Sequence, residues 1–512
     1  MRQIVKNSLL VVLSVTSAGA WARLPVHEPV APAHPILGRR IVSHGVVVVD
    51  GRRIPYTATA GTLILKNKKN QPTASMFYVA YTRSGVRHLS QRPITFVYNG
   101  GPGSSSVWLL MGGLGAVRVV TANARVTPPP PYPVISSPSS LLPVTDLVFI
   151  DAVGTGYSHV VGVGRDKDFW GVDDDVRSFG QFIERYISQN NRWNSPKFLL
   201  GESYGTTRSA NLVDYLEGQG ITCNGVILLS SILNYGDSWP GTDLRYITYL
   251  PSYTAVAWYH HALPEQPAHL APLIRKVEQF ARTSYAYALF QGSRLSPAKK
   301  AAVLATLHQY TGLSTGFLEA VHLRVTPDRF RAQLLRDRGR EQFVGRLDAR
   351  FTGINRDGAE ESPDYGALMA AVSPAFTAAF NWYVRERLHY SAHRAYRVMN
   401  GQVIQKWNWN HRFPGAGYSW PLPDVAPNLA DAMRKNPYLQ IFSGNGYFDL
   451  ATPFYKTEFD FAHMKLPHRL MTRIHFHFYH SGHMLYLHPA TLAHLDRNLI
   501  QFYHMVLARD HQ

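Results

Sequence analysis

Apolar and polar positions change their spacing several times along the 512-residue chain. Between residues 41 and 98, runs such as IVSHGVVVVDGRRIPYTATAGTLIL alternate apolar with small or polar residues, and an Asp-Gly pair at 50–51 separates two of them. Alternation with a period of two is typical of strands, and Asp-Gly favours a tight hairpin turn. We therefore expect β structure in this part of the chain, with a hairpin at 50–51.

Residues 145–230 alternate short apolar runs with amphipathic stretches. The runs TDLVFID, SPKFLLGE and CNGVILLSS have the length of buried strands. Between them lie a helix-like segment at 173–189, with acids in its first turn, and another at 206–220 that glycine closes. Strand–helix–strand alternation predicts an α/β fold with a mostly parallel sheet flanked by helices.

Strand-like runs are scarce between about residues 235 and 425. Three segments there open with Ser-Pro or Thr-Pro, at 296–297, 326–327 and 373–374, which is the pattern of an N-cap followed by proline at the first helical position. Apolar strand runs resume near residue 438. We expect three parts, listed by residue number: the first part of the α/β core at 23–235, a helical insertion at 236–425, and the C-terminal part of the core at 426–512. The Pro/Ser-rich stretch 127–143 is expected to be irregular.

The first 22 residues have the pattern of a secretory signal peptide. Arg2 and Lys6 precede the apolar run Leu9–Val15, and Ala20-Trp21-Ala22 has the A-x-A form of a cleavage site. The apolar run is too short to span a bilayer, and we expect no transmembrane segment later in the chain. The sequence thus predicts an exported protein, periplasmic or secreted, cleaved after Ala22.

The cysteine content bears on how the fold is stabilised, and the net charge bears on the possible partners. Cys223 is the single cysteine, so the fold has no internal disulfide and depends on its core. The net charge is +18, or 18 − 2 = +16 without Arg2 and Lys6, which favours electrostatic contact with an anionic cell envelope. The basic residues are scattered and form no nucleic-acid-binding motif, so we expect no nucleic-acid partner.

The stretch GESYG at 201–205 places Ser203 between two glycines, after the apolar run KFLL and before an amphipathic segment. A sharp strand-to-helix turn of this kind exposes a serine hydroxyl, although a serine in an ordinary βα turn fits the same pattern. A nucleophilic serine needs a base, and the base needs an orienting acid. Asp449 and His483 each follow a later strand-like run, in the order serine, acid, histidine. Each could also be ordinary: Asp449 a loop-capping acid, and His483 one histidine among 23.

Two further stretches carry possible chemistry. VYNGGPGSSS at 97–106 follows a strand-like run, and backbone N–H groups in such a glycine loop can face a developing oxyanion. His475 and His477 share one face of a predicted strand, where a metal pair is conceivable. No Asp, Glu or Cys lies at ligand spacing from them, so we expect neither a metal site nor a cofactor.

Five motifs together resemble those of the serine carboxypeptidase family of α/β hydrolases, in a disulfide-free, bacterial-type form. They are NGGPGSSS, FIDAVGTGYS, GESYG, GNGYFD and SGHM, and the resemblance runs from about residue 90 to the C-terminus. It implies an α/β-hydrolase fold in which residues 236–425 form a helical cap. It implies serine-type carboxypeptidase activity, with Ser203 as nucleophile, His483 as general base and acid, and Asp449 as its orienting partner. By the same resemblance, the amides of Gly101 and Tyr204 form the oxyanion hole.

The resemblance also gives a role to the glutamate before the nucleophile. It implies that Asn99, Gly100 and Glu202 bind the C-terminal carboxylate of a peptide. A carboxyl group donates a hydrogen bond to another carboxylate only when it is protonated, so such binding weakens as Glu202 ionises.

The chain departs from the family pattern at three places. Gly113 stands where the family has a second glutamate, and Arg118 is a candidate replacement. Ser104 stands where the family has a cysteine, and GESYGTTR lacks the usual Ala-Gly after the tyrosine. The loss of the second glutamate leaves open an esterase or acyltransferase with the same triad. A catalytically silent protein that binds the envelope is the third alternative.

Overall fold

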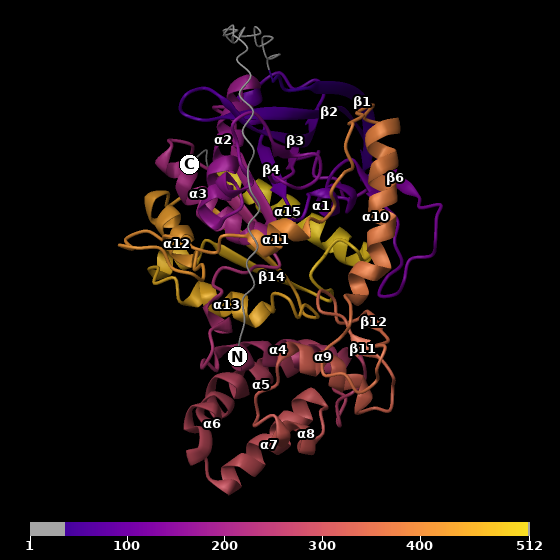
Figure 1. Cartoon of the computed structure of the whole chain (residues 1–512), viewed down its shortest axis with the longest axis vertical. Helices are drawn as coiled ribbons and strands as arrows, with labels where there is room; N and C mark the ends of the chain where they lie inside the picture. Colours follow the sequence, from indigo (N-terminus) through magenta and orange to yellow (C-terminus); the bar gives the residue numbers. More distant parts are fainter. Residues whose placement is uncertain (1–35, 510–512) are drawn as a thin grey trace, which may run out of the picture. The chain divides into compact units, whose positions relative to one another are not determined.

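The computed structural model describes residues 36–509, so the predicted signal peptide lies outside the described residues. The main element is a ten-stranded sheet (Figure 1). Along the sheet its strands are β1 (Arg40–Val49), β2 (Arg52–Lys66), β3 (Pro72–Arg83), β7 (Asp146–Ile150), β4 (Ile94–Tyr98), β9 (Lys197–Glu202), β10 (Gly225–Leu229), β13 (Gln440–Gly446) and β14 (Ile474–Tyr479), with β8 (His159–Val160) beside β3. The neighbours in the series β7-β4-β9-β10-β13-β14 pair in parallel, whereas those in the series β1-β2-β3-β7 pair antiparallel. Strands β1 and β2 form the hairpin predicted at 50–51. The predicted α/β fold class and mostly parallel sheet are confirmed.

Helices cover both faces of this sheet, which explains why the central strands are apolar throughout. Successive side chains of β9 point to opposite faces, so Phe198 and Leu200 join one core and Leu199 the other. The helices of the first core are α1 (Val107–Met111), α10 (Ala367–Glu386) and α15 (Pro489–Arg509). Those of the second core are α2 (Val172–Gln189), α3 (Tyr204–Gly218) and α12 (Ala426–Lys435).

A third apolar core lies within the helical part of the chain. Its helices are α4 (Leu244–Tyr259), α5 (Leu270–Phe280), α6 (Ala286–Gln291), α7 (Pro297–Thr311), α8 (Thr315–Ala320) and α9 (Pro327–Arg336), with a π-helical turn at Ala281–Tyr285. The side chains of Ser296 and Thr326 cap α7 and α9 as predicted. Phe448 and Leu450 belong to the same core, so these helices pack directly against the loop that carries Asp449. The domain boundaries at 235/236 and 425/426 stay predictions.

The remaining elements are short. The small strands are β5 (Val117–Val119) paired with β6 (Val134–Ser136), and β11 (Phe343–Val344) paired with β12 (Thr352–Gly353). The remaining helices are α11 (Gly401–Lys406), α13 (Phe454–Ala462) and α14 (His468–Met471). Strand β6 corrects the expectation that 127–143 is wholly irregular, because a short ladder to β5 satisfies its backbone groups.

Helix α10 corrects two further expectations. It begins at Ala367, so Pro374 lies inside it rather than at its first position. Residues on both sides of Pro374, such as Leu368 and Phe380, are buried in the core, and this packing keeps the helix continuous despite the missing N–H. By length and composition α10 could also span a membrane, which we did not expect of any segment after the first 22 residues. Its ring contact of 5.1 Å between Phe376 and Trp108 shows that it packs in the core of the protein.

Candidate active site

Ser203 lies at a sharp turn between β9 and α3. Its backbone angles, φ 61° and ψ −129°, are unusual for a residue other than glycine. The turn also brings Gly201 against the first turn of α3, where a Cβ atom at position 201 would stand 2.1 Å from the carbonyl oxygen of Gly205. A residue with a side chain does not fit there, so this glycine permits the turn that directs the Ser203 hydroxyl into a cavity.

Asp449 and His483 meet at the same end of the sheet. The Asp449 carboxylate is fully buried and accepts a hydrogen bond from His483 Nδ1 over 2.7 Å. Its other contacts are with the amides of Ala451 and Thr452, at 2.7 and 3.0 Å, and with the Thr452 hydroxyl at 2.6 Å. This set of donors fixes both the carboxylate and the tautomer of the imidazole.

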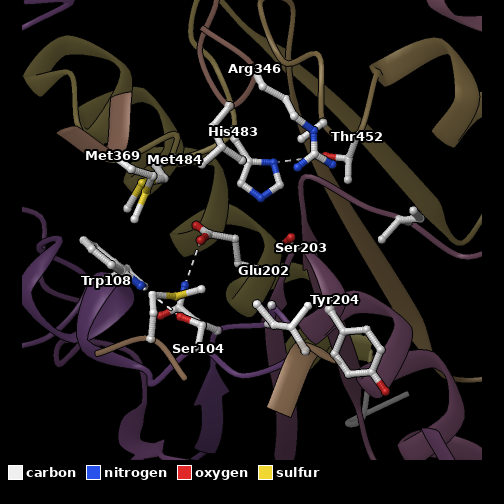
Figure 2. Close-up of a pocket in the computed structure, with 18 of the residues that line it drawn as sticks. Ser104, Trp108, Glu202, Ser203, Tyr204, Arg346, Met369, Thr452, His483 and Met484 are labelled. Atoms are coloured by element: carbon white, nitrogen blue, oxygen red, sulfur yellow. Dashed lines mark hydrogen bonds between the residues drawn. The ribbon is translucent and has the colours of Figure 1, made fainter. Parts of the chain in front are cut away.

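The imidazole of His483 lies over the Ser203 hydroxyl in Figure 2. Burial alone would lower the pKa of His483, but the charge of Asp449, the hydrogen bond to it and the charge of Glu202 outweigh burial and raise the pKa. A histidine in this position can accept the serine proton and stabilise the resulting imidazolium against a buried carboxylate.

Two backbone amides, those of Gly101 and Tyr204, belong to segments that pack closely together beside Ser203. Gly100 packs so closely on the start of α3 that a Cβ atom there would stand 2.4 Å from the amide nitrogen of Tyr204. The amide of Tyr204, as the first in α3, has no partner within the helix, and Gly101 with φ +107° turns the loop beside it. The amides of Gly101 and Tyr204 are thus available as a pair of donors for an oxyanion.

Glu202 is buried next to the triad and is only partly hydrogen-bonded. Its Oε1 accepts from Asn99 Nδ2 at 2.7 Å and from the Tyr486 hydroxyl at 3.2 Å, whereas its Oε2 has no partner among the described residues. Burial raises the pKa of Glu202 to about 7, against the opposing effects of His483 and of these two hydrogen bonds. Near neutral pH, the Oε2 atom can therefore carry a proton and donate it in a hydrogen bond.

The position of the family's second glutamate is filled differently. Gly113 has φ +114°, and a Cβ atom there would stand 2.9 Å from the side chain of Leu492. Arg118 lies on β5, is buried and does not line the cavity, so it is not the replacement. Tyr486, three residues after His483, supplies the second hydrogen bond to Glu202 instead.

A buried arginine connects the loop that holds Asn99 to the helix that follows Ser203. Arg208 on α3 forms an ion pair with Asp175 at 2.6 Å and donates a hydrogen bond to the backbone oxygen of Asn99 at 2.8 Å. Its guanidinium also lies 5.5 Å from the ring of Tyr204. The loop that holds Asn99 and the helix that begins at Tyr204 are thereby joined through one side chain.

Ser203, Glu202 and His483 line one cavity of about 400 Å³. In Figure 2, Trp108, Met369 and Met484 lie on the Glu202 side of the Ser203 hydroxyl, and Tyr204 and Thr452 lie on the other side. The remaining lining residues are Asn99, Gly100, Gly101, Ser104, Ile232, Tyr235, Arg346, Leu347, Met399, Ile404, Trp409 and Ala451.

The structure brings the predicted site residues together, with Asp449 directly behind His483 and the other seven lining the cavity. It places His475 and His477 elsewhere: His475 contacts Gln440 at 3.1 Å, and His477 stacks on Phe442. Within residues 36–509, no group of three or more His, Cys, Asp or Glu side chains could hold a metal ion. Ser104 accepts a hydrogen bond from Trp108 Nε1 at 2.9 Å and so helps to position the wall of the cavity.

The sequence did not indicate four residues of this site, listed here: Thr452, Tyr486, Arg346 and Arg208. Thr452 follows Asp449 by three residues, and a hydroxyl at that spacing from an acid is the one local signal that could have been used. For the others no local pattern exists: Tyr486 and Arg208 bond to partners far away in the chain, and Arg346 lies at the cavity because of where its segment packs.

The chain is similar to known proteins in sequence and in fold. Residues 55–271 match the family model described as serine carboxypeptidase. No curated protein sequence matches the chain. Among solved structures, the chain is similar to Kex1ΔP, a prohormone-processing carboxypeptidase from Saccharomyces cerevisiae, at 15% identity and a TM-score of 0.53, over 88% of this chain and 91% of that one. A proline iminopeptidase from Mycobacterium smegmatis is 13% identical with a TM-score of 0.36, over 88% and 99% of the two chains. The predicted α/β-hydrolase fold and the resemblance to serine carboxypeptidases are confirmed.

Proposed function

We propose that this chain, a hydrolase of the serine carboxypeptidase type by its match over residues 55–271, is an exported enzyme that removes C-terminal amino acids from peptides through an acyl-enzyme on Ser203. The observation that carries the proposal is the buried Glu202 carboxyl, which has a free oxygen beside the triad. Export rests on the signal-peptide pattern of residues 1–22. The high positive charge supports contact with an anionic envelope, where peptide substrates would be met.

Binding begins with the free carboxylate of the peptide. Protonated Glu202 donates a hydrogen bond through Oε2, while Asn99 holds Oε1 and the Gly100 amide adds a further donor. An amide or ester at the same place offers no negative charge to this site. With the terminal carboxylate at Glu202, we expect the last residue of the peptide on the Glu202 side of the cavity and the scissile carbonyl at the Ser203 hydroxyl.

The chemical steps follow from the positions of the proton donors and acceptors. His483 Nε2 takes the proton of Ser203 as Oγ attacks the carbonyl carbon, and the amides of Gly101 and Tyr204 stabilise the oxyanion. Collapse of the tetrahedral intermediate breaks the peptide bond, and His483 gives its proton to the leaving amino group. His483 then activates a water molecule that releases the peptide acid from Ser203.

The test compares a blocked peptide with a free C-terminus and its C-terminal amide, using mass spectrometry between pH 5 and 7. We expect stepwise trimming of the acid, at a kcat/KM about 100-fold or more above that of the amide, because the amide leaves a buried donor unpaired. Similar rates on both, or turnover of simple esters alone, would contradict the proposal.

An esterase is the second candidate, and the missing carboxyl at Gly113 is the observation that favours it. An ester substrate need not carry a free carboxylate, so a site with a single glutamate suffices for it. Turnover of esters without any trimming of free-acid peptides would support this candidate.

We expect Glu202→Gln to change the pH dependence of peptide cleavage more than that of ester cleavage. In the wild type, peptide binding weakens as pH rises through about 7, because Glu202 loses the proton that it donates. Glutamine donates an N–H at every pH, so this alkaline loss disappears for peptides. The variant also removes a negative charge that raises the pKa of His483, so the acid limb moves to lower pH for both substrates.

The measurement is kcat/KM from pH 5 to 9 for a free-acid peptide and for an N-acyl amino acid ester. Glu458→Gln is the matched control, because Glu458 is half-buried with a pKa that burial raises to about 8 but lies outside the cavity. Identical shifts for peptide and ester in Glu202→Gln would remove Glu202 from carboxylate binding.

A further inference from the structure

We propose that Arg346 gives the enzyme a preference for substrates with Asp or Glu at the penultimate position, the residue whose carbonyl Ser203 attacks. This inference rests on the proposed function, because it needs the C-terminal carboxylate to lie at Glu202. It specifies the substrate class of the same site. Arg346 lies in the segment between β11 and β12, which is outside the five sequence motifs.

The cavity has two chemically different sides. On the Glu202 side, Figure 2 shows Trp108, Met369 and Met484, which are large, apolar and adaptable. This side suits an apolar leaving residue. On the other side, the guanidinium of Arg346 lies near Thr452 and beyond the imidazole of His483. A peptide that places its terminal carboxylate at Glu202 therefore extends its penultimate side chain toward Arg346.

The backbone of Arg346 is held in a fixed place relative to the triad. Its carbonyl oxygen accepts a hydrogen bond from the amide of Leu450, next to Asp449, at 2.9 Å. The following residue, Leu347, accepts a hydrogen bond from the amide of His483 at 2.6 Å. The segment is thus hydrogen-bonded to the loops that carry Asp449 and His483. These bonds hold the backbone of Arg346 at a fixed position relative to the triad.

The guanidinium of Arg346 itself is free. It is exposed and has no hydrogen bond or ion pair with the described residues 36–509. The nearby Arg350, by contrast, is buried and neutralised by Asp348 at 2.6 Å. An arginine without a carboxylate partner in a substrate cavity is available for a carboxylate of the substrate.

Electrostatics within the cavity favour the same assignment. Among the described residues that line it, Arg346 is the one Lys or Arg, and Glu202 is the one Asp or Glu. Glu202 is neutral when it binds a carboxylate, so the cavity is then positive on the Arg346 side. Arginine binds a carboxylate through two parallel N–H donors, which a glutamine side chain on the substrate cannot match.

The test measures kcat/KM at pH 6.5 for blocked peptides that end in Glu-Leu, Gln-Leu and Lys-Leu. We expect the wild type to cleave the Glu peptide about 10-fold faster than the Gln peptide and to cleave the Lys peptide slowest. Arg346→Gln should reduce the Glu/Gln ratio to below about 2-fold, and Arg346→Glu should make the Lys peptide the best of the three. Arg340→Gln is the matched control, because Arg340 lies in the same part of the chain but does not line this cavity.

Three results would overturn the inference, and they differ from failure of the proposed function. Equal rates on the Glu and Gln peptides in the wild type would exclude a role for Arg346 at the penultimate position. Equal slowing of all three peptides in Arg346→Gln would mean that Arg346 binds the terminal carboxylate instead. An unchanged Glu/Gln ratio in that variant would place the preference elsewhere. If no free-acid peptide is cleaved at all, this result contradicts the proposed carboxypeptidase function, on which the inference about Arg346 rests.

Discussion

Replacing Ser203 with alanine is expected to abolish peptide cleavage, with kcat reduced by about 10⁶-fold. The hydroxyl is the nucleophile of the proposed acyl-enzyme, and no other serine hydroxyl among the described cavity residues lies beneath the imidazole of His483. Residual activity would reflect only the oxyanion donors and substrate binding. The measurement is single-turnover cleavage of the free-acid peptide, together with labelling by a fluorophosphonate.

The control for this variant is Ser178→Ala on α2, whose buried hydroxyl donates a hydrogen bond to the backbone oxygen of Asp175 at 2.7 Å. It should keep its labelling and its activity. A wild-type protein that is folded yet not labelled would contradict the nucleophile and favour the catalytically silent alternative. Labelling that persists in Ser203→Ala would assign the nucleophile to another serine.

Asp449→Asn is expected to lower kcat by about 10⁴-fold with little change in KM for the peptide. In the wild type, Asp449 Oδ2 accepts hydrogen bonds from both His483 Nδ1 and the Thr452 hydroxyl. An asparagine amide at this position donates, so it favours the imidazole tautomer that has its proton on Nε2 and cannot accept one from Ser203. The loss should be smaller at high pH, where hydroxide replaces the general base.

Asp460→Asn is the matched control, since Asp460 is also buried but pairs with Lys456 on α13. Both variants remove a buried carboxylate, so thermal unfolding measures the structural cost that they share. A kcat loss in Asp449→Asn no larger than that in Asp460→Asn would contradict the orienting role. Steady-state kinetics from pH 6 to 9 provide the comparison.

Chain order and strand pattern indicated Ser203, Asp449 and His483 as candidates, and the resemblance to serine carboxypeptidases assigned their roles. In a parallel sheet the carboxyl ends of the strands meet at one edge, so loops after β9, β13 and β14 are neighbours wherever they lie in the sequence. Ser203, Asp449 and His483 each follow such a strand, and the glycines at 201 and 205 indicated the turn at Ser203. Local sequence could also locate the caps at Ser296 and Thr326, because a cap is made within one turn of helix.

Local sequence did not predict features that depend on packing between distant parts of the chain. Pro374 indicated a helix start, yet α10 begins seven residues earlier because burial of its apolar side outweighs one lost hydrogen bond. The glycine at 113 indicated that a carboxyl was missing, but it could not indicate what replaces it. That replacement, Tyr486, is separated from Glu202 by 284 residues.

The sequence by itself thus determined the class of fold and predicted the triad and the glycine loop of the oxyanion hole, because each depends on a strand end or a turn that short motifs encode. Only the tertiary structure decided the environment of these groups. It buried Glu202 beside Tyr486, inserted Arg208 behind Asn99, and joined Arg346 to both catalytic loops. Burial and charge act through space between segments that are distant in the chain, so the pKa of Glu202 and the polarity of the substrate cavity are properties of the packed molecule.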